Sequence, residues 1–492
     1  MTNVDEPVRP RPAAPPAATA ATTPWPAVAI VLAGAFMAIL DSFIVIVAGP
    51  AIQADLGASD GELQWILAGY QLTYAVFLIT GGRLGDMLGR KRMFVAGMTL
   101  FTLASVACAV SPTAAGLIAA RLVQGLGAAL MLPQVYAAIT GLVGEKDRHR
   151  AFGVLGVVIG LATIGGQLIG GLLIGADVFD SGWRSVFRIN VPIGIVTVLL
   201  AARHLPESRA AFARRLDLPG VVVLSAALFL LAFPLIQGPE AGRPWWTWAG
   251  LAASALGFAL FVRIERGVGR RGGDPLVRIS LFASRSFSVG IVLVLALYAV
   301  LTSYYLVLSI ALQDGLGMSA LGAGLVYAPA AVTFFVFSML ASRLVPKYGR
   351  RVLEAGAVVL AAGYAATAIV LAGGLPFTPG VIIPTLMLQS VGGGLLITPA
   401  LNAVLTRIDP DDAGIASGVL STAQQVGGAL GVAVIGVVFF DSFHPSAHHA
   451  PQAAATAAGH ALAMSSVFTC VIAIAATVLV YLLPNHPRPT AR

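Results

Sequence analysis

The chain has 492 residues, of which 58% are hydrophobic and only 11% are charged. A soluble domain carries about 25% charged residues, so this composition excludes a soluble globular protein and indicates a membrane protein. The net charge of +8 is therefore no sign of nucleic-acid binding, because in a membrane protein the position of the bases matters more than their sum.

The chain is predicted to begin with a disordered tail at residues 1–26, since residues 1–24 are rich in Pro, Ala and Thr. The next apolar run is long enough to span a membrane, so no signal peptide is expected. Fourteen such runs predict an all-α membrane protein with fourteen spans, although the short run 189–203 and the proline-interrupted run 380–404 leave the count open by one or two. The runs lie near residues 27–49, 63–82, 93–110, 114–138, 151–175, 189–203, 218–237, 247–264, 286–311, 322–342, 353–373, 380–404, 414–440 and 461–483.

The basic residues predict which loops face the cytoplasm. With a cytoplasmic N-terminus and alternating loops, 26 of the 30 Lys and Arg residues lie on cytoplasmic segments, as the positive-inside rule requires. The exceptions are Arg184, Arg188 and Arg243 outside and Arg121 within a span. Both termini, including a tail at 484–492, are therefore predicted to be cytoplasmic in a multi-pass protein of the plasma (inner) membrane, and the composition suggests a bacterium.

Three blocks of sequence recur in the same order 260 or 265 residues later. They predict two six-helix bundles, residues 27–203 and 286–483, joined by a linker at 204–285 that adds two extra transmembrane helices. The matching positions are Arg83, Gly89 and Arg90 with Arg343, Gly349 and Arg350; Gln124, Gly127 and Leu130 with Gln389, Gly392 and Leu395; and Gly153, Gly166 and Gly171 with Gly418, Gly431 and Gly436.

The loop at residues 81–92 reads GGRLGDMLGRKR between two predicted spans. An ordinary basic loop would explain its bases but not the spacing of its glycines and Asp86. The pattern predicts a gate on the cytoplasmic side, in which Asp86 meets a base or a helix N-terminus of the second half, and Arg90 and Arg350 brace the same closed state. The predicted gate residues are Gly82, Arg83, Gly85, Asp86, Gly89, Arg90, Lys91 and Arg350.

With this loop the chain resembles the major facilitator superfamily, and specifically its fourteen-span drug:proton antiporter family. Other segments are similar to that family's signatures, in chain order: Leu40-Asp41 with Val45, Val47 and Pro50; Arg121 to Gly127; Trp183-Arg184 with Asn190 to Gly194; Gln313 to Leu325; and Ala416 to Gly418 with Gly427-Gly428. The resemblance covers roughly residues 27–483 and implies an antiporter driven by a proton gradient, with no other cofactor.

Two positions depart from the family pattern. Its helix-5 antiporter motif is matched by Gly153, Gly166, Gly170 and Gly171, but Gln167 stands where the family has proline. The glycines still permit close helix contacts, while the proline kink is expected to be lost. Ala48-Gly49 also departs from the first-helix signature.

Asp41 and Arg121 are the only acid and base placed well inside predicted spans, and such groups are functional candidates by default. Asp41 lies nine residues before Pro50 and Arg121 nine after Pro112, so both are predicted at about 13 Å from the external end of their helices. We interpret them as the proton-coupling pair, in which burial favours the neutral acid and the base favours the charged acid. The alternative is a fixed ion pair that only orients two helices.

The substrate cavity is expected near the midplane between the two halves. Its candidate lining residues are Gln71, Tyr74, Gln124, Gln134, Tyr305, Tyr327, Asn402 and Gln424, although contacts between helices explain any one of them equally well. A single buried acid suits a lipophilic neutral or monocationic compound. A histidine-rich segment at His444, His448, His449 and His460 is read as a loop rather than a metal site.

The sequence favours a transporter that exports drug-like or antibiotic-like compounds in exchange for protons, acting as a monomer in the lipid bilayer. An enzyme is not expected, since the zinc-protease motif HExxH does not occur, and an ATP-driven pump is not expected, since none of the three lysines completes a phosphate-binding loop. Two rivals stay open: a proton-coupled uptake porter of the same fold, and a membrane sensor that transports nothing.

Overall fold

The computed structural model describes residues 25–177, 180–209, 217–405, 408, 413–440, 442–443 and 451–483. Every regular element in these ranges is helical, as the sequence predicted. The long helices are α1 (Trp25–Leu56), α2 (Asp60–Leu88), α3 (Arg90–Ala109), α4 (Ala114–Leu142), α5 (Glu145–Ala176), α7 (Asn190–His204), α8 (Leu218–Glu240), α9 (Trp245–Arg270), α10 (Arg285–Ile310), α11 (Ala320–Tyr348), α12 (Arg350–Ala372), α13 (Pro379–Leu405), α14 (Ala413–Phe440) and α15 (Pro451–Leu482). Short elements are η1 (Gly182–Arg184), α6 (Ser185–Arg188), η2 (Ile279–Ala283) and the π-helical turn η3 (Ala311–Gly315).

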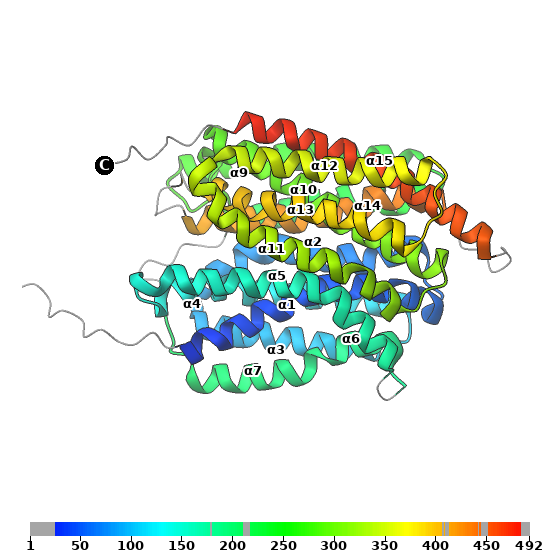
Figure 1. The fold of residues 1–492 in the computed structure, drawn as a ribbon. Helices are drawn as coiled ribbons and strands as arrows, with labels where there is room; N and C mark the ends of the chain where they lie inside the picture. The colour runs from blue at the N-terminus through cyan, green and yellow to red at the C-terminus, as the bar shows by residue number, and fades with distance from the viewer. Residues whose placement is uncertain are drawn as a thin grey trace, which may run out of the picture.

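The helices form a bundle of near-parallel rods whose lengths suit a bilayer (Figure 1). Within the described chain, thirteen helices are long and apolar enough to span a membrane, and α5 makes fourteen when its two bent pieces count as one span. The short predicted run at 189–203 gains its length from η1 and α6, so that the whole span covers Gly182–His204.

Helix α5 corrects one expectation from the sequence. Without the family's proline it is still bent, by 43° between its pieces Gly153–Thr163 and Gly165–Ala176. The break coincides with a pair of glycines, Gly165 and Gly166, and with a Thr163 hydroxyl that donates to the Ile159 carbonyl at 2.9 Å. Glycine pairs and such hydroxyl bonds are known causes of helix bending, so proline is not needed here.

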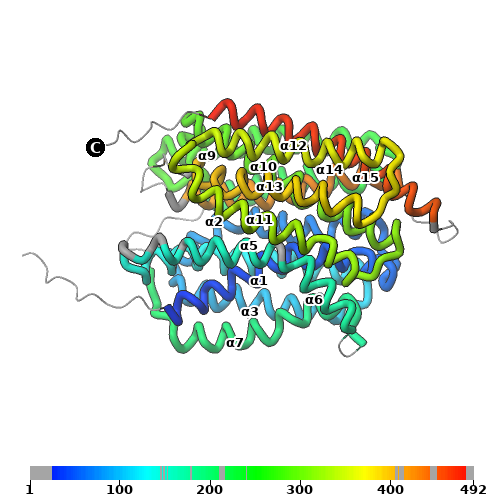
Figure 2. Tube along the Cα trace, viewed as in Figure 1, coloured from blue at the N-terminus to red at the C-terminus, as the bar shows by residue number. Residues whose placement is uncertain are grey.

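The same helix pairings occur twice along the chain. In the first half α1 contacts α5, α2 contacts α4, and α3 contacts both α4 and α7. In the second half the corresponding pairs are α10 with α14, α11 with α13, and α12 with α13 and α15. The two halves form two layers in the tube view (Figure 2). The fold is therefore two six-helix bundles with α8 and α9 inserted between them in sequence.

The turn from the second to the third helix of each half is built in the same way. Gly89 (φ 116°) and Gly349 (φ 58°) occupy the region of positive φ that favours glycine, and each lies between two helices. The preceding helices also begin alike, because Ser59 accepts from the Glu62 backbone N–H and Ser319 from that of Gly322. The recurring sequence blocks thus correspond to recurring local structure.

Helix α1 begins and α15 ends at one end of the bundle, which we call the basic end because residues 82–92 and 343–351 lie there (Figure 1). At the opposite end the halves meet closely, since a Cβ on Gly171 would come within 2.6–3.2 Å of Ala320 and Leu321, and Gln313 Nε2 donates to the Val47 carbonyl at 3.0 Å. Towards the basic end, a Cβ on Gly153, Gly156 or Gly160 of α5 would meet no atom within 4 Å.

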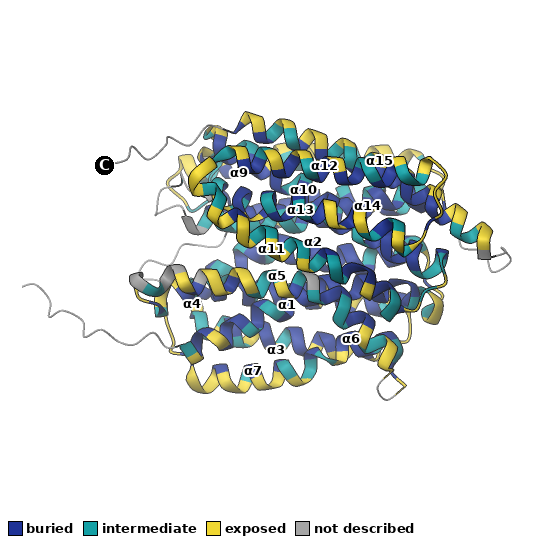
Figure 3. Ribbon diagram, in the orientation of Figure 1, coloured by how far each residue is buried: buried dark blue, intermediate teal, exposed yellow. Residues whose placement is uncertain are grey.

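Buried residues gather inside the two layers, and exposed residues lie on the outer faces (Figure 3). On α7, for example, Val196 is 55% and Leu199 is 64% exposed. Exposed aliphatic side chains on a long helix fit a lipid environment and would be costly in water. The chain is therefore a multi-pass membrane protein.

A buried ion-pair network as the candidate functional site

Asp41 and Arg121 are brought together inside the first half. Asp41 lies midway along α1 and Arg121 lies in the first half of α4, and both side chains are fully buried (0% exposed). An Arg121 Nη1 hydrogen bond and ion pair joins the guanidinium to Asp41 Oδ2. The equal depths inferred from Pro50 and Pro112 therefore correspond to direct contact.

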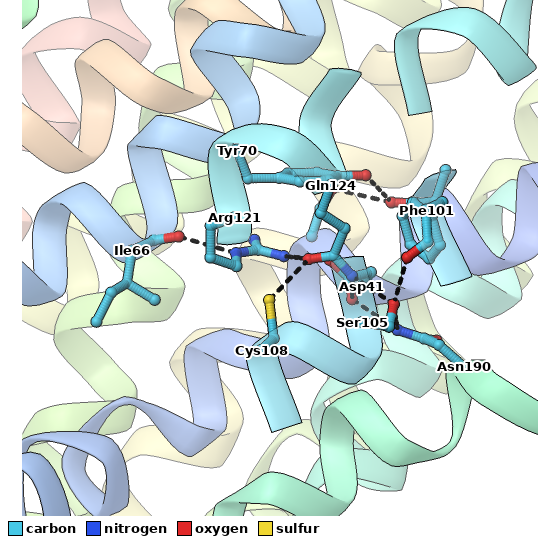
Figure 4. Close-up of polar contacts among 11 residues, drawn as sticks. Asp41, Ile66, Tyr70, Phe101, Ser105, Cys108, Arg121, Gln124 and Asn190 are labelled. Atoms are coloured by element: carbon cyan, nitrogen blue, oxygen red, sulfur yellow. Dashed lines mark hydrogen bonds and ion pairs between the residues drawn. The ribbon is translucent and has the colours of Figure 1, made fainter. Parts of the chain in front are cut away.

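Residues of α4 itself and of two neighbouring helices, α2 and α7, complete the hydrogen bonding of this pair (Figure 4). Asp41 Oδ1 accepts from Gln124 Nε2 at 2.9 Å and from Asn190 Nδ2 at 2.8 Å. Arg121 Nη1 also donates to Gln124 Oε1 at 2.7 Å, and Arg121 Nε donates to the Ile66 carbonyl at 3.0 Å. Buried charges are stable only when paired and hydrogen-bonded, and this network meets that condition.

Aromatic rings and a small polar layer enclose the network. The Arg121 guanidinium lies 4.2 Å from the centre of the Tyr70 ring, which adds a cation–π contact. On the other side Gln124 Nε2 donates to Ser105 Oγ at 2.9 Å, and Ser105 donates in turn to the Phe101 carbonyl at 2.8 Å. The arrangement can exchange a proton only if the surrounding helices move, because no member of the pair reaches solvent in this state.

Asn190 and Ser105 were missed as site residues by the sequence. Asn190 stood within a segment already similar to the family's sixth-helix signature, so a signal for it was present. Ser105 gave none, because a serine in an apolar run is common and usually bonds its own helix.

Among the described residues, Asp86 finds its partner within the loop 82–92 and not in the second half, contrary to the expectation for it. The carboxylate of Asp86 pairs with Arg90 of the same loop at 2.9 Å. Arg350 instead pairs with Glu354 at 2.7 Å and donates to the Leu483 carbonyl at 2.6 Å, both in its own half. Arg90 and Arg350 therefore do not share a contact in this structure. Arg90 is paired with Asp86 of its own loop, and Arg350 is paired with Glu354 of its own half.

The remaining loop residues bind elements that the sequence did not suggest. The Lys91 backbone N–H donates to Glu207 Oε1 at 3.2 Å, and Arg92 lies 3.5 Å from Glu207 Oε2. Arg83 is buried and donates to the backbone carbonyls of Asp274 and Pro275, in the segment that follows α9. A Cβ on Gly82 would lie 3.5 Å from the Pro133 side chain. A Cβ on Gly85 would collide with the Gln134 side chain, so the glycine leaves room for it.

The helix-5 motif lies where three helices cross. Side chains at Gly166 and Gly170 would collide with Phe43, Ile44 and Val47 of α1, and a side chain at Gly171 would collide with α11. Gln167 Nε2 donates to the Phe43 carbonyl at 3.2 Å, so this residue ties α5 to α1 at the position where the family has proline. Gly153 lies outside this contact.

Most of the predicted cavity residues serve contacts between helices. Gln124 belongs to the ion-pair network, and Gln134 donates to the Gly81 carbonyl at 2.8 Å. Tyr74 is buried beside Tyr70, and Gln71 is buried beside Gly428. In this structure these four side chains lie between helices, where polar groups inside a membrane often find their partners.

The other four candidates all lie in the second half. Tyr327 donates to the Tyr305 carbonyl at 3.0 Å, and their rings form an edge-to-face pair. Gln424 Nε2 donates to the Tyr298 hydroxyl at 2.7 Å, and both side chains are only partly buried. Asn402 is exposed. The histidines at 444, 448 and 449 lie outside the described residues, and the part of the chain that is described contains no cluster of metal-ligating side chains.

Two six-helix halves, a buried ion pair and exposed apolar outer faces define a membrane transporter of the major facilitator type. The Major Facilitator Superfamily model matches residues 31–432, and the chain belongs to this family. It is 40% identical over 420 residues to a probable actinorhodin transporter of Streptomyces coelicolor, covering 85% of this chain and 72% of that protein. It is 35% identical over 463 residues to the cephamycin export protein CmcT of Amycolatopsis lactamdurans, covering 92% of each chain.

A tetracenomycin C resistance and export protein of Streptomyces glaucescens is 34% identical over 425 residues, covering 84% of this chain and 76% of that one. Among solved structures, a bacterial homologue of the human lysosomal transporter Spinster, in an inward-facing and occupied conformation, aligns with a TM-score of 0.65 at 17% identity, over 93% of this chain and 96% of that one. At that identity the structural likeness shows the fold alone.

Proposed function

We propose that the chain exports drug-like or antibiotic-like compounds, lipophilic and neutral or monocationic, in exchange for protons by alternating access. The observation that carries this proposal is the Asp41–Arg121 pair sealed within the first half. The export direction is supported by relatives named for the export of cephamycin and tetracenomycin C. In this proposal the protein lies in a bacterial plasma membrane with its basic end in the cytoplasm, where the positive-inside rule puts the bases.

Protonation of Asp41 would change the balance of forces between α1 and α4. A neutral acid no longer offsets the buried guanidinium of Arg121, and an unpaired buried charge costs several kcal/mol. The proton-loaded form therefore needs a different placement of α1, in which Arg121 finds water or another partner. Because α1 also packs against α5 through Gly166 and Gly170, that movement would reach the seam between the halves.

Substrate binding is best supported beside α14, which borders the first half where Thr422 Oγ1 donates to the Ala75 carbonyl of α2 at 3.3 Å. Gln424 of α14 donates to the Tyr298 hydroxyl of α10 at 2.7 Å, and both side chains are partly exposed. Aromatic rings with one polar edge suit lipophilic compounds that carry few hydrogen-bonding groups. We expect Tyr298→Phe to weaken substrate binding while proton coupling persists.

The substitution Asp41→Asn tests the proposal. In expressing cells, the wild-type protein should lower the accumulation of a fluorescent drug, and an uncoupler should restore accumulation. Asp41→Asn should abolish this effect, whereas Glu354→Gln, which alters a carboxylate of the second half, should preserve it. Undiminished proton-coupled export by folded Asp41→Asn protein would overturn the proposal. Gradient-dependent uptake would indicate a porter that imports its substrate, and no effect of the wild-type protein would favour a sensor.

A further inference from the structure

A second group of buried charged residues lies at the basic end, apart from the Asp41 network. Asp217 directly precedes α8, and Glu265 lies near the end of α9. In the structure Asp217 is 6% exposed and Glu265 is 1% exposed. Among the described residues, Asp41 is therefore not the only deeply buried acid.

Each of these carboxyl groups uses one oxygen and leaves the other without a partner. Asp217 Oδ1 accepts from the Gly220 backbone N–H at 3.0 Å, and Glu265 Oε2 accepts from the Val277 backbone N–H at 2.8 Å. Asp217 Oδ2 and Glu265 Oε1 are buried and have no hydrogen-bond donor. Buried polar atoms without partners are rare in native proteins and call for an explanation.

The two unpartnered oxygens lie at the same place in the fold. A Cβ built on Gly220 would come within 3.0 Å of both Glu265 Oε1 and Asp217 Oδ2. Two negative charges so near each other and shielded from water repel strongly, whereas one proton between them would satisfy both oxygens. The charged groups that interact with Glu265 are Asp217 beside α8 and Arg83 of α2, and the guanidinium of Arg83 does not titrate.

The same carboxyl pair is connected to the loop 82–92 through one short segment. Residues 274–277 are held on one side by Arg83, which donates to the carbonyls of Asp274 and Pro275, and on the other side by Glu265. Leu276 is fully buried. The segment then leads through η2 into α10, the first helix of the second half. It therefore links a loop of the first half to the beginning of the second.

We propose that Asp217 and Glu265 form a second proton-binding site, in which one shared proton holds the segment 274–277 against Arg83. The proton comes from water at the basic end and forms an O–H bond to one carboxyl group, which donates to the other. When the proton leaves, the two carboxylates repel each other, Glu265 turns away, and the Val277 N–H loses its acceptor. The segment then separates from Arg83. This site does not depend on which compound the protein transports.

Hydrogen exchange of the purified full-length protein in nanodiscs tests the proposal. Protection factors for residues 274–281, corrected for intrinsic exchange, are compared at about pH 6 and about pH 9, a range that spans the titration of buried carboxyl pairs. In the wild-type protein we expect protection to fall about tenfold or more at the higher pH. If protection in α3 or α12 fell by the same factor at the higher pH, the whole protein would have loosened, and the proposal would be overturned.

Two variants make the test specific. Glu265→Gln offers a carbonyl to Val277 and an amide donor to Asp217, so it imitates the proton-sharing state and should stay protected at both pH values. Glu354→Gln should keep the wild-type response, because its partner is Arg350. An unaltered pH response in Glu265→Gln would overturn the proposal.

Infrared spectroscopy supplies a second measurement. At about pH 6 the wild-type protein should show a protonated carboxyl C=O band beyond that of Glu265→Gln, and an identical band in both would also overturn the proposal.

Discussion

The two halves use the same helix crossings but place different chemistry at their centres. In the first half Gln124 of α4 donates to Ser105 of α3 and serves the Asp41–Arg121 pair. In the second half the matching Gln389 of α13 donates to Thr367 of α12 at 3.1 Å.

The ion pair itself has no counterpart in the second half. The position that corresponds to Arg121 is Leu386, which is 1% exposed. Within the described residues the buried charged side chains all lie before residue 286. The scaffold is thus shared, while the buried charged side chains of the described residues lie in the first half and in the inserted segment that carries α8 and α9.

Replacing Arg121 by leucine would make the first half resemble the second and should have the largest effect. Arg121→Leu leaves Asp41 buried without its countercharge, so we expect a loss of about 3–5 kcal/mol in stability and complete loss of transport. Thermal unfolding in detergent and drug accumulation in cells measure the two effects. The double variant Asp41→Asn/Arg121→Leu should regain much of the stability but no transport; equal stability of the single and double variants would contradict this account.

The shared scaffold predicts equal effects at two matched glycines. A Cβ on Gly127 would lie 2.6 Å from the Phe101 backbone nitrogen, and one on Gly392 would collide with the Leu360 backbone. We expect Gly127→Ala and Gly392→Ala each to destabilise the protein by about 1–3 kcal/mol, because a backbone cannot move aside as a flexible side chain does. If only one of them lowered the unfolding temperature, the two crossings would not be equivalent.

The matched glutamines should separate stability from transport. Gln389→Leu removes one neutral hydrogen bond, so we expect a cost of about 1 kcal/mol and nearly normal transport. Gln124→Leu costs Asp41 a donor and Arg121 an acceptor, and it should reduce proton-coupled transport about tenfold or more while the protein still folds. Similar transport by both variants would remove the functional distinction between the halves.

The smallest effects on stability are expected at the ion pairs of the two basic loops. Asp86–Arg90 and Arg350–Glu354 are partly exposed pairs of residues four apart in sequence, each worth about 0.2–1 kcal/mol. We expect Asp86→Asn to slow transport while substrate binding is retained, and Glu354→Gln to change neither. Rate measurements in proteoliposomes and equilibrium binding of the same compound check this; parallel loss of rate and binding would argue against a gating role.

The sequence predicted the elements whose signals are local. The apolar runs predicted the helices, and the recurring blocks predicted the paired bundles, because both depend on composition and spacing along the chain. Asp41 and Arg121 could be paired since prolines at the helix ends fixed their depth.

What the sequence missed depends on contacts between distant segments. Nothing local indicates that Asn190 reaches Asp41, that Glu207 binds the start of α3, or that Arg83 binds the segment after α9. Glu265 directly follows the apolar run 247–264, and nothing local indicates that α8 and the segment 274–277 bury it. The bend of α5 was missed because a proline was taken as its cause.

The Asp41–Arg121 pair has an electrical consequence. With Asp41 ionised the pair carries no net charge, whereas protonation leaves a charge of +1 from the guanidinium. A membrane potential of about 100 mV acts on one elementary charge with about 2.3 kcal/mol. One proton exchanged for a neutral compound would therefore draw on the voltage as well as the pH gradient, while exchange for a monocation would move no net charge and draw on the pH gradient alone.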